Sequence, residues 1–422
     1  MAKTLNTRAI AAKISWQIID QGKSLDAAMD NYFDAHEATN QDRGFVQELV
    51  YGVCRWYGAL EQSLNTVLRS PIRKKDRIIH FVLLVGLYQL RHLQTADHAA
   101  VGETVNACKQ LDKPWAKNLV NGCLRNYQRS TNSTDEMTQS YQSHPDWLID
   151  EIKAAWPNQC GQIMLENNRR PPMCLRVNRR INTVAQYQQK LVSNEIPSHI
   201  DPHCQDGIIL GQPVPVNALP DFFSGAVSVQ DSAAQIACDL LQVEPGMSVL
   251  DACSAPGGKA AHLLERSDNM ITMTALDISE SRCEQTKDTM QRLKLTANII
   301  CSDASDEPVW QHAQQGYDRI LIDAPCSGTG VIRRHPDIKH HRMPSDIVRL
   351  TQIQADIMKN LWPLLKPSGL MLYMTCSILP QENEAQIRRF LANQNDAMLA
   401  NYEHPNALNL EHGKQTLPGG PC

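Results

Sequence analysis

From about residue 225 onward, short apolar segments alternate with amphipathic ones, and this alternation constrains the fold more than any other feature. Segments such as MSVLDAC and YDRILIDAPC have the pattern of buried strands, and ESRCEQTKDTMQRLKL has that of a helix. Strands that alternate with helices predict a doubly wound, mostly parallel α/β sheet. Ligands of such folds bind beyond the carboxyl ends of the strands, so functional side chains should follow strand ends.

The first part of the chain has a different pattern, and the 422 residues are enough for more than one domain. Helical periodicity dominates up to about residue 130, and RIIHFVLLVGLYQLRHL (77–93) is apolar almost all round, which predicts a central buried helix. The polar stretch RSTNSTDEMTQS predicts a linker. We predict a helical domain (1–130), a linker (131–144), a small intermediate α/β subdomain (145–224) and the α/β domain (225–422).

Composition excludes several classes of protein. The net charge of -4 leaves only local basic patches to hold a nucleic acid, and no apolar run is long enough to span a bilayer. The 13 cysteines are scattered without a CxxC pair, which disfavours zinc sites and predicts no metal. Scattered thiols without an apolar signal segment predict a cytoplasmic protein with reduced cysteines. Five cysteines are expected to be small core residues: Cys54, Cys108, Cys123, Cys238 and Cys301.

The loop DACSAPGGK (251–259) follows the first strand of the alternating region. Gly257 and Gly258 permit close backbone approach, but the loop is neither GxGxxG nor a P-loop, so it favours a nucleoside ligand over a triphosphate. Asp277, about 20 residues further on, suits the ribose hydroxyls. Asp303 ends the next strand, where it either faces an adenine edge or caps the following segment.

Two cysteines, Cys326 in DAPCSGTG and Cys376 in MTCS, follow successive strands that should be neighbours. Adding a thiolate to carbon 6 of cytosine activates carbon 5 as a nucleophile, and an acid such as Asp323 assists at ring N3. A second thiol then helps the product to leave. DAPCSGTG alone favours Cys326 as the attacking thiol, and MTCS offers Cys376 as the alternative.

The motifs DACSAPGGK, LDIS, SDA, DAPCSGTGVIRRHPDIK and KPSGLMLYMTCSILPQENE resemble the Sun family of S-adenosylmethionine-dependent RNA cytosine-C5 methyltransferases. The N-terminal ELVYGVCRWY and VNGCLRNYQR resemble a NusB-like RNA-binding module. The resemblance implies a Rossmann-like class I methyltransferase domain behind an all-helical NusB-like domain and a small intermediate α/β subdomain. Members of the family usually have an aromatic-rich strand after LPG, so the final strand of this sequence is expected to be missing.

The resemblance also implies roles for the site residues. Cys376 is the nucleophile, Cys326 assists release of the product, and Asp323 lies near both cofactor and base. The implied S-adenosylmethionine site comprises Cys253, Ser254, Ala255, Pro256, Gly257, Gly258, Lys259, Asp277, Asp303 and Asp323. The implied substrate is 16S rRNA, before or during assembly of the small subunit, at cytosine 967, and we expect a monomer that binds no membrane.

Three basic runs are candidate phosphate contacts. They are Arg169, Arg170, Arg176, Arg179 and Arg180; then Arg333, Arg334, Lys339 and Arg342; and the segment 72–77. The target cytosine should be single-stranded or flipped out. Two other readings stay open. One is a DNA cytosine-C5 methyltransferase with Cys326 as nucleophile, and the other is a non-catalytic RNA-binding or ribosome-assembly factor that keeps the fold. A dehydrogenase is disfavoured because the chain lacks GxGxxG.

Overall fold

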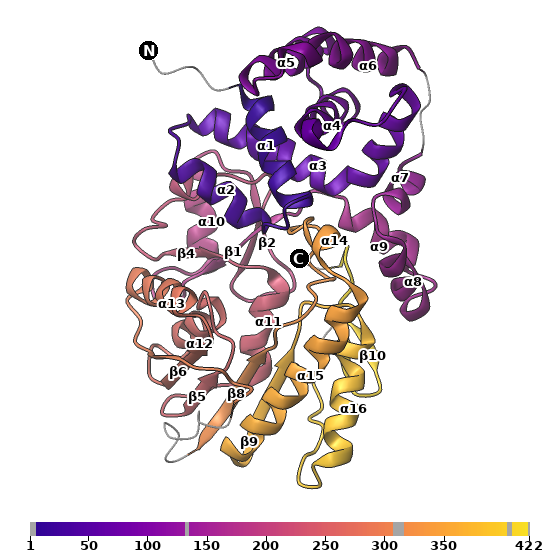
Figure 1. Cartoon of the computed structure of the whole chain (residues 1–422). Coiled ribbons are helices and arrows are strands. Elements are labelled where there is room, and N and C mark those ends of the chain that lie inside the picture. The colour runs from indigo at the N-terminus through magenta and orange to yellow at the C-terminus, as the bar shows by residue number, and fades with distance from the viewer. Residues whose placement is uncertain (1–5, 131–134, 307–315, 403–406, 421–422) are drawn as a thin grey trace. The chain divides into compact units, whose positions relative to one another are not determined.

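The computed structural model describes residues 6–130, 135–306, 316–402 and 407–420 (Figure 1). The chain divides into two compact units, which are described in turn. The helical unit comprises Met1–Arg169 and Val331–Met343. The sheet unit comprises Arg170–Gly330 and Pro344–Cys422. In the described part of the chain, no helix is both long and apolar enough to cross a bilayer.

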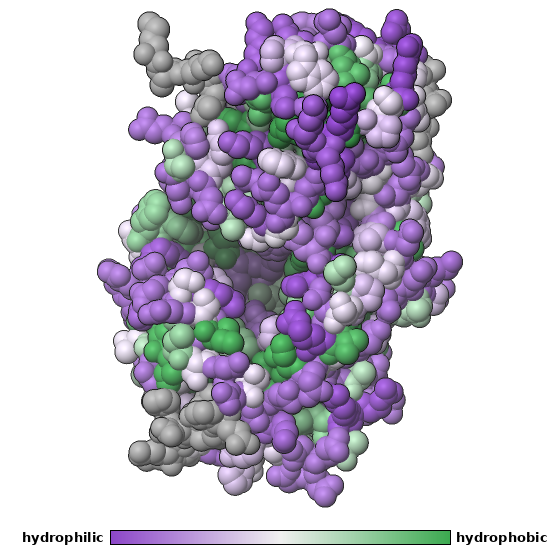
Figure 2. Space-filling view, in the orientation of Figure 1, coloured by the Kyte–Doolittle hydropathy of each residue, from purple (hydrophilic) through white to green (hydrophobic). Residues whose placement is uncertain are grey.

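Helices build the first unit, as the sequence predicts. They are α1 (Thr7–Ile19), α2 (Leu25–Asp34), α3 (Asn40–Val67), α4 (Arg77–His92), α5 (Asp97–Gln110), α6 (Lys117–Arg129), α7 (Glu136–Gln142), α8 (Asp146–Ala155), α9 (Cys160–Asn167) and α14 (Ile338–His341). Short 3-10 turns at Lys74–Asp76 and Pro114–Ala116 precede α4 and α6. The prediction of a central buried helix is confirmed, because every residue of α4 from Ile79 to Gln89 is buried and α4 packs on α1, α3, α5 and α6. Hydrophilic side chains predominate on the outer face of this unit in Figure 2.

The polar stretch predicted as a linker contains a helix. Residues 131–134 lie outside the described part, but α7 begins directly after Asp135, whose carboxylate caps the helix by accepting a hydrogen bond from Thr138 N–H at 2.9 Å. An aspartate before a helix supplies an acceptor that its first turn lacks. The polar composition here therefore reflects a capped, partly exposed helix.

The segment 331–343 follows the Cys326 loop in sequence yet belongs to the helical unit. Asp337 Oδ2 accepts a hydrogen bond from Leu25 N–H at 3.0 Å, and His341 Nε2 lies 2.8 Å from the carbonyl oxygen of Ile18. The sequence expectation placed this segment in the domain 225–422. The difference arises because its polar side chains pair with carbonyl and amide groups of distant helices.

The sheet unit contains a small antiparallel sheet with the strand order β2-β3-β1-β4. Its strands are β1 (Met173–Val177), β2 (Ser198–Ile200), β3 (Gly207–Leu210) and β4 (Val227–Val229), and α10 (Val184–Ser193) packs against β2 and β3. The small hydrophobic core of this subdomain includes Leu175, Tyr187 and Ile208. A 3-10 turn lies at Val216–Ala218.

The larger sheet has five parallel strands in the order β7-β6-β5-β8-β9, which confirms the predicted Rossmann-like fold (Figure 1). The strands are β5 (Ser248–Asp251), β6 (Thr272–Asp277), β7 (Asn298–Cys301), β8 (Tyr317–Asp323) and β9 (Leu365–Met374). The helices are α11 (Ser232–Leu241), α12 (Gly258–Arg266), α13 (Glu280–Leu293), α15 (Pro344–Leu361) and α16 (Glu384–Asn393). Short elements near β9 and the C-terminus are 3-10 turns at Trp362–Leu364 and Pro380–Glu382, and the hairpin β10 (Leu408–Leu410) and β11 (Gly413–Gln415).

Alternate residues of the strands enter two separate cores. Val249 packs with α11, α12 and α13, whereas its neighbour Leu250 packs with α15. Helices therefore cover both faces of the sheet, as buried parallel strands require. The expectation that Cys301 is a core residue is wrong, because it is exposed at the end of β7, the edge strand, whereas Cys54, Cys108, Cys123 and Cys238 are buried.

Gly52 of α3 provides a test of the packing between α3 and α4. A Cβ atom at this position would lie 1.9 Å from the Tyr88 ring, so Gly52→Ala should lower the free energy of unfolding of the helical unit by about 1–3 kcal/mol through overpacking. Gly44 lies in the same helix, and a Cβ added there would meet no other atom within 4 Å. Gly44→Ala should therefore stabilise the unit by roughly 0.5–1 kcal/mol. Thermal unfolding of both variants measures these changes, and equal midpoints would contradict the packing described.

Candidate active site

The carboxyl ends of neighbouring parallel strands meet at one edge of the large sheet. Asp251 ends β5, Asp277 ends β6 and Asp323 ends β8. Asp323 pairs in register with Met374, the last residue of β9, and Cys376 follows two residues later. The expectation that the two cysteine-bearing strands are neighbours is confirmed.

The two thiols at these strand ends are in contact. Cys326 Sγ and Cys376 Sγ lie 3.2 Å apart, with Cys326 half-buried and Cys376 exposed. Gly330 N–H donates to the Cys376 carbonyl oxygen at 2.8 Å, and a Cβ on Gly330 would lie equally close to that oxygen. A glycine is therefore needed where the two loops approach each other.

The contact separates the acidities of the two thiols. The hydrogen bond with Cys326 lowers the pKa of Cys376, Lys259 adds to this effect, and together they outweigh the desolvation of the Cys376 sulfur. The same hydrogen bond, together with burial, raises the pKa of Cys326 well above its ordinary value. The thiolate is the nucleophilic form of cysteine, so these shifts favour the thiolate of Cys376 over that of Cys326. Burial also raises the pKa of the nearby Cys253, which disfavours its thiolate.

Lys259 and Asp323 form an ion pair. It connects the loop 253–259, called the nucleoside loop below, with the end of β8, from which the loop that carries Cys326 begins. Burial opposes the charge on Lys259, but the carboxylates of Asp323 and Asp251 raise the pKa of its ammonium overall. The lysine is therefore charged at neutral pH. It links residue 259, at the start of α12, with the acid three positions before Cys326.

The loop from Cys253 to Lys259 turns directly into α12. Ser254 N–H donates to the Leu276 carbonyl oxygen at 2.9 Å, which ties the loop to β6. Gly257 has φ +89°, and a Cβ there would lie 3.0 Å from Thr286 Cγ2, so this turn requires glycine. As at the start of any α-helix, the first amide groups of α12 have no helical partners, so they are available to a ligand.

Asp277 joins this loop to the start of α13. Its Oδ2 accepts from Ala255 N–H at 3.2 Å and its Oδ1 from Ser279 N–H at 3.2 Å. Arg282, which the sequence analysis did not identify, lies 3.3 Å from the Asp277 carboxylate and donates to the Ala255 carbonyl oxygen at 2.9 Å. The available signal was its position five residues after Asp277, in the first turn of the helix that follows β6. A carboxylate has about four acceptor sites, so Asp277 retains capacity for ribose hydroxyls.

Asp251 shows that the site suits a cationic, donor-rich nucleoside. Its carboxyl group is buried and, within the described structure, neither of its oxygens makes a hydrogen bond of normal geometry; the same holds for Ser254 Oγ. Burial raises the pKa of Asp251 to about 7, although Lys259 opposes the shift. S-adenosylmethionine carries an ammonium, a sulfonium and ribose hydroxyls, so the residues present fit this cofactor: Asp251, Ser254 and Asp277 would hold its donors.

Asp303 stands apart from this group. Its Oδ1 accepts hydrogen bonds from Ser305 N–H at 2.8 Å and from Ser305 Oγ at 2.6 Å. It therefore caps the segment that follows β7, which was one of its two expected roles. Contact between Asp303 and an adenine edge stays a prediction.

One member of the first basic run, Arg176, is buried and is not available to a phosphate, whereas the other four arginines of the run are exposed. The Arg176 guanidinium binds both oxygens of Glu265, at 2.9 and 3.0 Å, and donates to the Gly258 carbonyl oxygen at 2.6 Å and to Gln230 Oε1 at 2.7 Å. It joins β1 of the small sheet to the start of α12. Arg179 also pairs with an acid, Asp206.

The prediction is also wrong for one member of the second basic run, because Lys339 is buried in the helical unit. Its ammonium donates to the Arg55 carbonyl oxygen at 2.6 Å and to Asn168 Oδ1 at 2.8 Å. Burial, with the nearby Arg55, holds the pKa of Lys339 well below its usual range. A buried lysine with these partners is not available to a phosphate.

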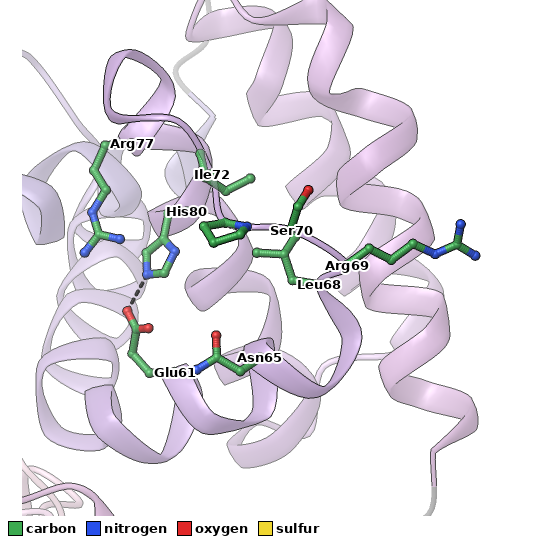
Figure 3. A pocket seen from close by; sticks show the side chains of 9 residues that line it. Glu61, Asn65, Leu68, Arg69, Ser70, Ile72, Arg77 and His80 are labelled. Atoms are coloured by element: carbon green, nitrogen blue, oxygen red, sulfur yellow. Dashed lines mark hydrogen bonds and ion pairs between the residues drawn. The ribbon is translucent and has the colours of Figure 1, made fainter.

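The third basic run lies on the surface of the helical unit. Arg73, Lys74 and Lys75 are exposed, and the two lysines line a cavity of about 300 Å³ together with Lys13 and Trp16. A second cavity, of about 280 Å³, adjoins the same run and is lined by residues that include Glu61, Asn65, Arg69, Arg77 and His80. Arg69 and Arg77 lie on opposite sides of it, and the paired Glu61 and His80 lie between them (Figure 3). Neither cavity is lined by the residues of the sheet edge.

The hydrogen bond between the thiols predicts the reactivity of Cys376. Its alkylation by iodoacetamide should have a pH midpoint below that of an ordinary thiol. In Cys326→Ala the donated hydrogen bond is lost, so the midpoint should move to higher pH and the rate at neutral pH should fall. Cys326→Ser keeps a donor and is the matched control. Peptide mass mapping follows the reaction, and an unchanged midpoint in Cys326→Ala would show that the thiol contact does not set the acidity.

Known families and curated relatives match the chain over nearly its whole length. Residues 238–420 match the family "16S rRNA methyltransferase RsmB/F", residues 5–129 the NusB family, and residues 144–217 the ferredoxin-like domain of RsmF/B-like methyltransferases. The "Ribosomal RNA small subunit methyltransferase B" proteins of Vibrio vulnificus and Vibrio cholerae are each 42% identical to this chain over 98% of its length, and the matches cover 96% and 94% of those proteins.

Solved structures agree on the fold. The crystal structure of PH0851 superposes with a TM-score of 0.82 at 22% identity over 99% of this chain and 96% of that one. A methyltransferase homologue from Pyrococcus horikoshii gives 0.53 at 25% identity over 65% and 88%. The chain therefore belongs to the ribosomal RNA small subunit methyltransferase B family and is an S-adenosylmethionine-dependent methyltransferase.

Proposed function

We propose that this enzyme methylates carbon 5 of one cytosine in 16S rRNA, cytosine 967, through covalent attack by Cys376. Family membership supports small-subunit rRNA as the substrate class. The contact between Cys326 and Cys376, beside the Lys259–Asp323 pair and the nucleoside loop, is the observation that carries the choice of cytosine carbon 5. Cytosine needs a nucleophile at carbon 6 before carbon 5 reacts, and this site supplies a thiolate and its proton donor.

Cys376 makes the first bond. Its thiolate adds to carbon 6, the C5–C6 double bond opens, and the electrons reach the ring N3 and carbon 5. When bound, S-adenosylmethionine supplies the electrophilic methyl group that carbon 5 then takes up. The lowered pKa of Cys376 favours the thiolate form that this attack requires.

Lys259 and Asp323 orient the base. One N–H of the Lys259 ammonium is used by Asp323, which leaves further donors for acceptor atoms of the pyrimidine edge, while the Asp323 carboxylate accepts from a donor such as the exocyclic amino group. The Lys259 ammonium thus opposes the negative charge that develops on the ring when the thiolate adds.

Cys326 acts in the second half of the reaction. The proton on carbon 5 must leave, the C5–C6 double bond must re-form, and the bond between carbon 6 and Cys376 must break. Cys326 lies 3.2 Å from the sulfur that departs, and its thiol, which stays protonated because its pKa is raised, donates a hydrogen bond to the re-formed Cys376 thiolate while solvent water takes the carbon 5 proton. The acidity of the two thiols disfavours the alternative in which Cys326 attacks.

A covalent complex tests this division of roles. Cys326→Ala should accumulate an RNA adduct that survives denaturation, because attack proceeds and release is impaired. Cys376→Ala should form none and should transfer no methyl group. Denaturing gel electrophoresis with labelled rRNA measures the adduct. If Cys376→Ala still methylates RNA, the assignment of the nucleophile is wrong.

The helical unit is proposed to hold the RNA through the exposed basic run at residues 73–75. Lys13, Lys74 and Lys75 line one cavity with the half-buried Trp16, so phosphate contacts and an aromatic face lie together. A flipped-out or single-stranded cytosine satisfies the need to expose its ring.

Reversing charge in this cavity tests the RNA contact. Lys74→Glu with Lys75→Glu should weaken rRNA binding. The slope of the logarithm of the binding constant against the logarithm of salt concentration should become shallower by roughly one to two, because one to two phosphate contacts are lost. Lys153→Glu with Lys359→Glu, which changes two exposed lysines elsewhere, is the control of equal charge. Filter binding at several salt concentrations gives both quantities, and equal slopes for the two double variants would contradict the placement.

A further inference from the structure

Glu382 is a fully buried carboxylate that the reaction described above does not use. It lies in the 3-10 turn Pro380–Glu382, between β9 and α16, and has 0% exposure. Burying a carboxylate is costly unless its oxygens receive hydrogen bonds, so its partners identify what it holds.

Those partners flank Cys326. Glu382 Oε1 accepts from Ser327 N–H at 2.8 Å, and Oε2 accepts from Ser327 Oγ at 2.5 Å. Gln354 Nε2 donates to Glu382 Oε1 at 3.1 Å and to the Pro325 carbonyl oxygen at 2.9 Å. The residues directly before and after Cys326 are therefore both tied to this carboxylate, one of them through Gln354.

The same cluster reaches the residue that follows the other cysteine. Ser327 Oγ lies 3.2 Å from both Thr329 Oγ1 and Ser377 Oγ, and these two oxygens are 3.1 Å apart. Main-chain groups complete the cluster, because Ile378 N–H donates to Thr329 Oγ1 at 3.1 Å and Leu379 N–H to Ser377 Oγ at 3.0 Å. A closed set of buried hydroxyl groups thus joins the two cysteine loops behind their thiols.

Hydrogen bonds also hold the backbone of Glu382, and one of them comes from a residue of β9. Tyr373 Oη donates to the Glu382 carbonyl oxygen at 2.6 Å, and Glu382 N–H donates to the Leu379 carbonyl oxygen at 3.1 Å. Its backbone and carboxylate are therefore both fixed, so it can act as a rigid reference for the loop that carries Cys326.

We propose that Glu382 is a positioning residue that sets the distance between Cys326 and Cys376 by clamping Ser327 and, through it, Ser377. The role of the thiol pair in methyl transfer rests on the proposed function, whereas the clamp itself does not. Glu382 holds the sulfurs in contact without touching either of them.

Two physical effects of Glu382 on Cys376 have opposite signs, which makes the proposal testable. The titratable groups that act on Cys376 are the thiol of Cys326 and the charged side chains of Asp323, Lys259 and Glu382, and the negative charge of Glu382 by itself raises the pKa of Cys376. Removing only that charge would lower this pKa. Losing the contact with Cys326 would remove the hydrogen bond that lowers it, and so would raise it.

The direct test is the rate at which the two thiols form a disulfide with diamide, which takes up the two protons and two electrons that they release. Peptide mass mapping identifies the Cys326–Cys376 product among those of the other cysteines. Glu382→Gln should slow its formation on the order of tenfold, because disulfide geometry is narrow. Glu384→Gln, the same change two residues on, should leave the rate unchanged.

Activity and acidity give independent readouts. Glu382→Gln should lower kcat for rRNA methylation on the order of 100-fold with KM unchanged, and should raise the pH midpoint of Cys376 alkylation. Glu382→Asp should recover part of both. Ser327→Ala removes one hydroxyl and keeps the carboxylate, so it should show the same direction with a smaller effect. Thermal unfolding identifies any variant that fails to fold, and Ser327→Ala then carries the test.

Disulfide formation at the wild-type rate in both Glu382→Gln and Ser327→Ala would overturn the proposal, as would a fall in the alkylation midpoint. If disulfide formation slows but the wild-type enzyme transfers no methyl group to cytosine, the clamp stands and the proposed function fails.

Discussion

The pairing of β8 with β9 is the constraint on which the rest of the site depends. Parallel register places Asp323 opposite Met374, and neighbouring strands lie about 4.8 Å apart, so the loops that leave them start side by side. Gly330 then lets the backbones approach, and the sulfurs reach 3.2 Å. From that distance follow the hydrogen bond between the thiols, the downward shift of the Cys376 pKa and the upward shift of the Cys326 pKa.

Several polar contacts that join elements of the sheet unit lie at buried or half-buried positions, where apolar side chains would cost less. Replacing a buried ion pair by apolar residues is often neutral or stabilising, so such pairs are weak evidence for stability. Arg176 with Glu265, Lys259 with Asp323, and Glu382 with Ser327 each connect separate elements of the sheet unit. Their common effect is to fix the loops at the sheet edge relative to one another. We infer that these groups hold the loops in position and that Asp251 binds a ligand.

Local pattern was enough to predict the parallel sheet, the buried α4 and the neighbouring cysteine strands, because each depends on periodicity or on the rule that strand ends carry the site. The burial of Arg176 and Lys339 was not predictable in this way. A run of charges looks the same in sequence whether water or a distant carbonyl group satisfies it, and the partners of these two residues lie in other elements. Edge position, which exposes Cys301, is likewise set by strand order. The role of Glu382 depends on contacts 55 residues apart in the chain.

The most direct measurement of the central claim is transfer of a labelled methyl group from S-adenosylmethionine to unmodified 16S rRNA, followed by digestion to nucleosides and mapping of the labelled fragment. The account predicts label on carbon 5 of a single cytosine, cytosine 967. Label on the ribose or the exocyclic amino group would contradict it, because neither product requires a thiolate at carbon 6. Absence of transfer to 16S rRNA would contradict the proposed substrate as well.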